Sequence, residues 1–181
     1  MVLSWNTICS IPQLQNLFTL RYIENDLDPT DKYILKRLLK QNGRLIQHVD
    51  HQTYELCLIS VHQNSSALEF IFPTNLTSQE YYNICLSSVR RDGFCLRLIQ
   101  DIPLLGSLYT NVCIEAVSEY TNSLIYVKDE FMNLEDYENV CMEAIRYNSA
   151  SYNLAKHKTE RLHQYFEVWK NIENDFENQI G

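Results

Sequence analysis

The sequence contains few glycines and prolines, and this scarcity restricts the fold class. The 181 residues include only 4 Gly and 4 Pro. Architectures made of many short strands need those residues at their frequent tight turns. Phosphate-binding loops need clustered glycines, and no P-loop, G-x-S-x-G or HExxH motif occurs. The sequence therefore disfavours a turn-rich β fold and the common catalytic motifs.

Long apolar runs and an excess of positive charge are also missing. The longest uninterrupted apolar stretches span four or five residues, whereas a membrane-spanning helix needs about 20. The N-terminus lacks the basic region and apolar run of a secretory signal. The formal net charge of −8 disfavours nucleic acid as a partner, because phosphate binding needs clustered Lys and Arg. We therefore expect no membrane association and a cytoplasmic location.

What the sequence does contain is enough apolar residues for one sizeable core. Hydrophobic residues make up 45% and charged residues 21%, which is typical of globular proteins. At this length we predict a single domain over residues 1–181. The six cysteines stand mostly in apolar, helix-like segments, which without an export signal indicates reduced thiols in a reducing compartment.

Four cysteines recur at a spacing of 28 residues, and their neighbours recur with them. The segments are YELCLISV at 54–61, YNICLSSV at 82–89, TNVCIEAV at 110–117 and ENVCMEAI at 138–145, so that Cys57, Cys85, Cys113 and Cys141 form one column. A fixed period of this size is typical of stacked repeats. The first repeat step, from Leu39 to Val61, is 22 residues, and we expect the six missing residues to fall in a connector.

Each repeat has the pattern of a helical hairpin. The cysteine, a small residue three positions later and a branched residue four positions later share one helix face, as Cys85, Ser88 and Val89 do. Small residues in this column let a neighbouring helix approach closely. A polar break follows, such as Gln41-Asn42-Gly43 or Arg91-Asp92-Gly93, which suits a helix C-cap and a tight reversal before a short second helix.

Helix-start signals place the first helices of two later repeats. Thr77-Ser78-Gln79-Glu80 is a capping box, which predicts the first helix of the third repeat. Asn133 with Asp136 predicts the start of the corresponding helix in the fifth repeat.

We predict an all-α fold, an α-solenoid-like stack of about five helical-hairpin repeats over residues 30–155. An N-terminal cap over 1–29 and a C-terminal capping helix over 156–181 would close the two ends. The last segment carries an apolar stripe at steps of three and four, formed by Leu162, Tyr165, Trp169, Ile172 and Phe176. A cap is our first interpretation of this stripe, and a coiled-coil dimer seam is the second.

The segment LLKQNGRLIQHV at 38–49, followed by YELCLISVHQNSSALEFI at 54–71, resembles a family of short helical-hairpin repeats of unknown function. That family pairs an A-V-K-x-N-G first helix with an A-L-x-x-A second helix, and it occurs in amoeba-associated bacteria and giant DNA viruses. Gln41-Asn42-Gly43 and Arg91-Asp92-Gly93 carry the resemblance, whereas Asn64-Ser65 lacks the glycine. The resemblance spans about residues 30–155. It implies a helical fold and brings no activity or catalytic residue.

The geometry of a stack disfavours a chemical role for the cysteine column. Zinc ligands must lie about 2.3 Å from one ion, while equivalent positions on packed helices are about 8–10 Å apart. We therefore interpret these cysteines as small buried core residues and expect no cofactor, no metal site and no enzyme. A hydrolase or transferase with a Cys–His site assembled in space stays open, because such partners meet only in the folded chain.

The distribution of charge is the most suggestive remaining functional signal, since the first repeat is basic and the fifth is acidic. Candidate partner-binding residues are Lys32, Lys36, Arg37, Lys40, Arg44, Arg90, Arg91, Glu135, Asp136 and Glu138. The simpler interpretation is that these are solvated helix faces. The functional one is that opposite ends attract head to tail, which would build rings or filaments.

Our hypothesis for function is a non-catalytic protein–protein interaction or scaffold module whose protein partner is unknown. It follows from the repeats and from the absence of a catalytic motif. The alternative is a self-assembling structural subunit, for example of a viral particle or factory, so a homo-oligomer stays open. If the chain is viral, the expected location is the host cytoplasm.

Overall fold

The computed structural model describes residues 29–180, and this part of the chain is helical with no β-strand. The predicted all-α class is confirmed. The predicted N-terminal cap, 1–29, lies outside the described residues except for Pro29, which begins the first described helix. None of the helices between residues 29 and 180 combines the length and the apolar character needed to cross a membrane.

Longer α-helices alternate with short 3-10 helices of six residues. The α-helices are α2 (Pro29–Gln41), α3 (Tyr54–Gln63), α4 (Ser78–Val89), α6 (Leu108–Glu119), α7 (Leu134–Tyr147) and α8 (Glu160–Ile180). The 3-10 helices are η1 (Gly43–His48), η2 (Ser65–Phe70), η4 (Gly93–Leu98), η5 (Thr121–Tyr126) and η7 (Ser149–Leu154). The second helix of each hairpin is thus a 3-10 helix, the tighter form that proteins use for short pieces.

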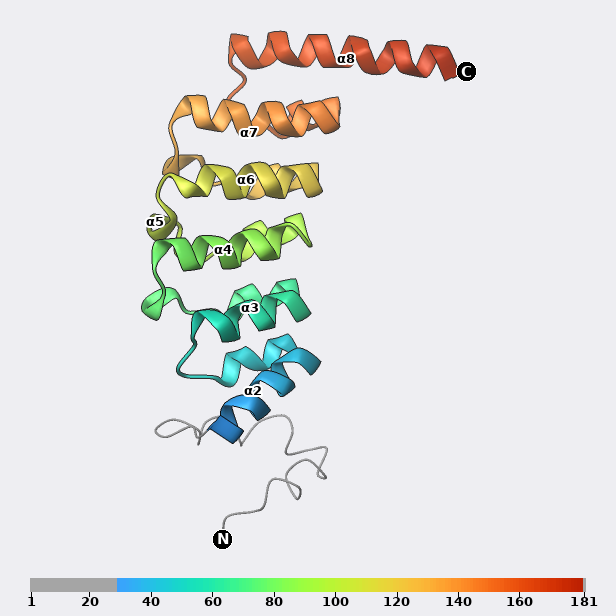
Figure 1. Ribbon diagram of the computed structural model, residues 1–181. Coiled ribbons are helices and arrows are strands. Elements are labelled where there is room, and N and C mark those ends of the chain that lie inside the picture. The colour runs from blue at the N-terminus through green and yellow to red at the C-terminus, as the bar shows by residue number, and fades with distance from the viewer. Residues whose placement is uncertain (1–28, 181) are drawn as a thin grey trace.

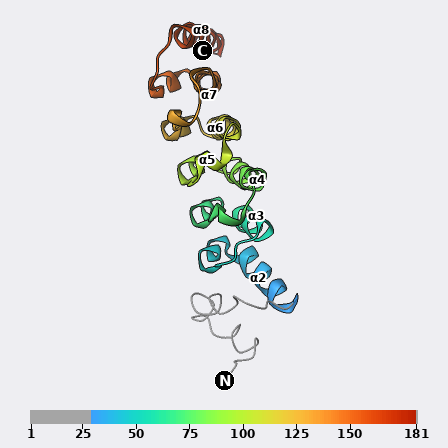
Figure 2. The same ribbon diagram turned by 90° about the vertical axis from the view of Figure 1, so that its left-hand side faces the viewer.

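The helix pairs lie one above another along a single direction (Figure 1). Figure 2 shows the 3-10 helices as a second column beside the α-helices. Contacts join neighbouring pairs along both columns, for example α3 with α4 and η1 with η2. The described part of the molecule is therefore an elongated two-layer stack, in which neighbouring pairs complete each other's core.

Connectors of different length join the pairs at one end of the helices, on the left of Figure 1. Three of them contain a further short helix, namely η3 (Pro73–Asn75), α5 (Ile102–Leu105) and η6 (Asp129–Phe131). The connector from η1 to α3, residues 49–53, contains none. This connector is two residues shorter than the next one, 71–77, and α3 begins 7 residues before Val61 whereas α4 begins 11 residues before Val89. The prediction that all six missing residues fall in a connector is therefore wrong, because two are missing from the connector and four from the start of the helix.

The predicted capping signals begin α4 and α7. At α4 the Thr77 side chain accepts the Glu80 backbone N–H at 3.3 Å, and the Glu80 carboxylate accepts the Thr77 N–H at 2.9 Å. At α7 the Asn133 side chain accepts the Asp136 N–H at 2.8 Å. Both predictions are confirmed, since the free N–H groups of a first helical turn need acceptors.

The polar breaks stand at the C-caps of the α-helices, as predicted: the backbone N–H groups of Asn64 and Asn148 donate to the carbonyls of Ser60 and Ala144. These caps lack the left-handed backbone that is common at helix ends, since within residues 29–180 the only positive φ belongs to Gly106, at 52°. The breaks also begin the 3-10 helices, through a side-chain oxygen that accepts the N–H two residues later. The residues that do so are Asn42, Asn64, Asp92 and Asn148.

The glycines of the breaks are explained by the close approach of the next helix. A Cβ on Gly43 would lie 2.2 Å from the carbonyl oxygen of Ser60, and a Cβ on Gly93 would lie 2.3 Å from that of Ala116. Ser60 and Ala116 belong to the small-residue column of the following α-helix. The predicted role of that column, to allow close helix approach, is confirmed at these two contacts.

The recurring cysteines lie in the core. Cys57, Cys85, Cys113 and Cys141 stand on α3, α4, α6 and α7, and each is 0% exposed and free of disulfide bonds. The prediction of a buried column is confirmed. Small apolar thiols suit this position, because they fill the seam between neighbouring helices without needing a strong hydrogen-bond partner.

A second buried column, not recognised in the sequence, fastens each helix to the connector that follows it. It consists of tyrosines four residues before the cysteines, whose hydroxyl oxygens accept backbone N–H groups. The bonds join Tyr81 to Gln100 at 3.2 Å, Tyr109 to Lys128 at 3.1 Å and Tyr137 to Lys156 at 2.8 Å. In the second repeat the buried Gln52 takes this role, accepting the Phe72 N–H at 2.9 Å.

Helix α8 covers the end of the stack formed by α7 and η7. Leu162 is fully buried, and the ring of Phe166 stacks on that of Tyr152 with centroids 4.4 Å apart. The Glu173 carboxylate accepts the Ser149 N–H at 3.0 Å and the Ser149 hydroxyl. The first residues of the apolar stripe on α8 thus pack against the stack, in agreement with a capping helix.

Candidate functional site

The exposed side of the α-helices carries two columns that recur with the repeats. The first column, two positions after the cysteine column, contains Arg37, Ile59, Ser87, Glu115 and Glu143. The second column, three positions further, contains Lys40, His62, Arg90, Ser118 and Arg146. Since neighbouring helices are stacked, a second-column residue of one helix lies beside a first-column residue of the next.

In the upper half of the stack these columns are joined by polar bonds. Arg90 of α4 donates two hydrogen bonds to Glu115 of α6, at 3.0 and 2.9 Å. Ser118 of α6 donates to Glu143 of α7 at 3.2 Å, and Arg146 donates to the same carboxylate at 3.0 Å. The bonds from Arg90 and Arg146 hold the pKa of the Glu115 and Glu143 carboxyls below their ordinary values. The four charged residues of the two columns in this half, Arg90, Glu115, Glu143 and Arg146, therefore each have a partner.

In the lower half the corresponding bonds are missing. Lys40 of α2 stands beside Ile59 of α3, and within residues 29–180 neither Lys40 nor His62 forms a side-chain hydrogen bond or ion pair. The surface is hollowed here: an open depression of ≈ 270 Å³ is lined by Lys40, Ile59, His62 and Gln63. We call it the α2–α3 hollow. At its edge the Gln63 side chain of α3 joins the end of α2 to the start of η1, because it accepts the Gly43 N–H at 2.6 Å and donates to the Gln41 carbonyl at 3.1 Å.

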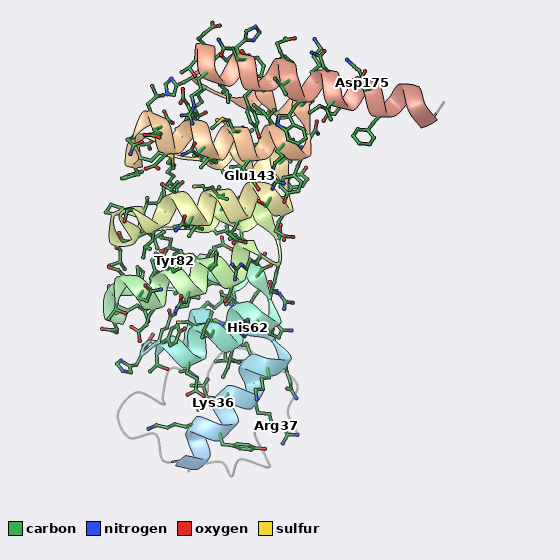
Figure 3. The ribbon with its side chains drawn as sticks, turned by 45° about the horizontal axis from the view of Figure 1, so that its top comes forward. Lys36, Arg37, His62, Tyr82, Glu143 and Asp175 are labelled. Carbon is green, nitrogen blue, oxygen red and sulfur yellow. The ribbon has the colours of Figure 1, made fainter. Side chains whose placement is uncertain are left out.

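The hollow combines an apolar wall with positive charge. Ile59 supplies the wall and Lys40 the nearest cation, while Arg37 lies exposed one turn before Lys40 on α2. Lys40 also stabilises the negative C-terminal end of α2, as a cation in the last turn of a helix does. Lys36 is partly neutralised by Glu55 at 2.6 Å. Figure 3 shows Lys36, Arg37 and His62 on the lower helices of the stack.

The remaining predicted basic residues divide into exposed and paired ones. Lys32 and Arg91 are exposed. Arg44 pairs with Glu69 at 3.7 Å and lies over the Phe70 ring, and Arg90 is the paired residue described above. The structure therefore brings only part of the predicted basic set, Lys40 with Arg37 nearby, to a hollowed surface.

The predicted acidic residues lie at the opposite end of the stack and are partly used within the chain. Glu138 is buried and accepts bonds from Thr159 at 2.5 Å and Arg161 at 2.9 Å. Glu135 is exposed, and Asp136 takes part in the cap of α7. The acidic and basic groups do not meet in one chain.

The cysteines of the described residues are buried and lie apart from the histidines. Burial raises the pKa of the Cys57, Cys85 and Cys113 thiols to about 12, so that they stay protonated and weakly nucleophilic at neutral pH. Among residues 29–180 no histidine bonds to a cysteine, and no three His, Cys, Asp or Glu side chains gather as metal ligands would.

Sequence reasoning singled out Lys40 and Arg37 but missed Ile59 and His62, which complete the hollow. The signal for them is the register of the two columns, in which Ile59 stands where Glu115 and Glu143 stand in later repeats. Comparison with protein-family models, with curated proteins and with solved structures finds no match to this chain.

Proposed function

We propose that the chain is a non-catalytic protein-interaction module whose α2–α3 hollow binds an acidic segment of a partner protein. The supporting observation is the break in the polar bonds between repeats. Positions that hold the Arg90–Glu115 pair elsewhere hold Lys40 and Ile59 here. A partner that carries a carboxylate beside an apolar side chain would supply what the next helix supplies in the upper repeats.

The size of the hollow favours a side chain over a free small molecule. Its ≈ 270 Å³ falls below the roughly 300–1,000 Å³ of sites that enclose drug-sized ligands. It is also open to solvent, whereas such sites surround most of their ligand. The natural occupant is one apolar side chain of a protein segment, with its flanking carboxylates over Lys40 and Arg37.

The buried thiols support a non-catalytic protein and fit a reducing compartment such as the cytoplasm. Membership of the repeat family that the sequence resembles, and with it an origin in a giant virus, stays a prediction.

A defined peptide tests the proposal. A fluorescent, glutamate-rich amphipathic helical peptide with a single phenylalanine should bind the chain, and a lysine-rich peptide of the same pattern should not. The double variant Arg37→Glu/Lys40→Glu should bind the acidic peptide at least about tenfold more weakly, because it replaces attraction by repulsion. Fluorescence anisotropy at several salt concentrations measures both affinities.

The matched control is Arg97→Glu/Lys128→Glu, which makes the same change of charge at exposed residues away from the hollow. It should retain most of the affinity, since exposed charges more than a Debye length of about 8 Å from the peptide are screened. Equal losses in the two double variants would show that net charge, rather than the hollow, governs binding, and would contradict the proposal.

A further inference from the structure

The end of α8 extends past the stack that the rest of the helix covers. Among the described contacts, the one furthest along α8 joins Glu173 to Ser149, at the start of η7. Residues 174–180 continue for about 10 Å at 1.5 Å per residue. Figure 1 shows this end projecting beyond α7, and Figure 3 shows Asp175 on the projecting part.

This end carries apolar side chains without a partner in the described chain. Val168, Ile172 and Phe176 follow one another at four-residue spacing and are 56%, 37% and 63% exposed. We call these three residues the exposed α8 stripe. A helix that packs on a stack normally turns such a stripe towards a neighbour, because removing large apolar side chains from water is favourable.

The same end is acidic. From residue 167 to 176 the charged residues are Glu167, Lys170, Glu173 and Asp175, and the last turn of α8 contains no basic residue. The C-terminal end of a helix adds a partial negative charge of about half a unit. Two copies of this helix end therefore repel each other, and a cationic surface is the complementary partner.

Within the described residues, the α2–α3 hollow offers that combination of charge and shape. It has an apolar wall at Ile59 and a cation at Lys40, with Arg37 exposed one turn earlier on α2, and the α8 end has an apolar Phe176 beside Asp175. The hollow and the α8 end lie at opposite ends of the stack, so they cannot meet within one chain (Figures 1 and 3).

We infer that the projecting end of α8 docks in the α2–α3 hollow of a second copy of this chain. Phe176 contacts Ile59 of the second copy, and Asp175 lies beside its Lys40 and Arg37. The inference rests on the proposed function of the hollow and names its occupant. Because the two contacting surfaces differ, the contact is head to tail, and copies join into filaments or closed rings.

Sedimentation velocity over a range of protein concentrations tests the contact. The wild-type chain should form larger species as concentration rises at low salt, and these should dissociate near about 1 M salt, where the Debye length falls to about 3 Å. Phe176→Glu should weaken association by roughly 30-fold or more, the usual effect of removing a central aromatic contact. Its matched control is Phe131→Glu, at a phenylalanine of η6 that is 42% exposed, which should associate like the wild type.

Mixing two variants separates head-to-tail docking from other modes. Phe176→Glu keeps an intact hollow, and Arg37→Glu/Lys40→Glu keeps an intact α8 end, so each alone should stay monomeric. An equal mixture should form a dimer and nothing larger, because only one competent contact exists between the two variants. Circular dichroism should show unchanged helix content in both, since the altered side chains are exposed.

Three outcomes would overturn the inference. They are a wild-type chain that stays monomeric at every concentration, an Arg37→Glu/Lys40→Glu variant that still associates, and a mixture that stays monomeric. If the wild type is monomeric while the acidic peptide still binds the hollow, the inference fails and the proposed function stands. If the peptide fails to bind the hollow as well, both fail.

Discussion

Single residues set how closely neighbouring repeats approach. Gly43 and Gly93 occupy a column in which other repeats carry Ser65, Thr121 and Ser149, and a Cβ at Gly43 or Gly93 would lie 2.2 or 2.3 Å from a carbonyl oxygen of the next helix. A side chain at either glycine would therefore require the next helix to move away.

Gly93→Ala should destabilise the chain. The new Cβ would lie 2.3 Å from the Ala116 carbonyl oxygen, so the two helices must move apart, at a cost of about 1–3 kcal/mol. Urea unfolding followed by circular dichroism measures the change. Ser65→Ala is the control, because it stands in the same column and already carries a Cβ, and the expected change is within about 0.5 kcal/mol. Equal effects of the two substitutions would contradict this explanation of the glycine.

At the scale of the elements, the buried tyrosines hold each connector to the helix before it. The connectors differ in length and content, yet the third, fourth and fifth repeats all place a backbone N–H on the tyrosine hydroxyl. A buried tyrosine hydroxyl needs a hydrogen-bond partner. The connectors share this bond although their sequences have little in common, and the bond fixes their path beside the helix.

Tyr109→Phe should leave the Lys128 N–H without its acceptor and reduce the free energy of unfolding by about 1–2 kcal/mol. The comparison is Tyr126→Phe on η5, whose hydroxyl forms no bond among the described residues and whose removal should have little effect. Thermal and urea unfolding of both variants measure the difference. If Tyr109→Phe is as stable as the wild type, the connector is held by other contacts.

The segment that leads into α8 is held to η6 by bonds to the Asp129 carboxylate. Lys156 donates to Asp129, and His157 lies 2.8 Å from the same carboxylate. These bonds lower the pKa of Asp129 from its ordinary 3.8 to about 2. Because the folded-state pKa is the lower one, the stabilisation is present above the ordinary value and is lost as the pH falls towards 2.

Asp129→Asn should therefore lose less stability than the wild type when the pH is lowered through this range. The fluorescence of Trp169 on α8 reports the attachment, in a Trp5→Phe background that removes the other tryptophan. Glu130→Gln, at the exposed neighbouring carboxyl, is the control, and its Trp169 fluorescence should change with pH as in the wild type. If the Asp129→Asn variant and the wild type lose the same stability as the pH falls, this carboxylate does not secure α8.

At the scale of the whole molecule, the core is built from contacts between neighbours. Contacts run from α2 to α3, α3 to α4, α4 to α6, α6 to α7 and α7 to α8. Stability in such a stack is close to a sum of local terms, and damage at one end is felt mainly there.

Leu162→Ala creates a cavity beneath α8, at a cost of about 2–5 kcal/mol in the free energy of the end repeat. Hydrogen exchange should speed up in α8, η7 and α7 and stay nearly unchanged in α3. Leu134→Ala, at a leucine that is 54% exposed, is the control and should change exchange little. Faster exchange throughout the chain would instead mean that the stack unfolds as one cooperative unit.

The helical class, the 28-residue period and the buried cysteine column could all be predicted from the sequence, which however placed the whole length variation in a connector, whereas the structure divides it between the connector and the start of α3. These features are local or periodic: a side chain's position along a helix decides whether it faces the core, and the Thr77 and Asn133 caps act within one helical turn.

Helix packing determines which surface of the described residues lacks a partner. Lys40, Arg90 and Arg146 look equivalent along the sequence, and it is the residue opposite each on a stacked helix that leaves Lys40 unpaired within the described residues. The glycine contacts, the tyrosine bonds and the projecting end of α8 have the same origin. Each depends on groups that are 17 to 24 residues apart along the chain. Helix packing and the path of the connectors set the distance between such groups, and a local sequence pattern does not specify it.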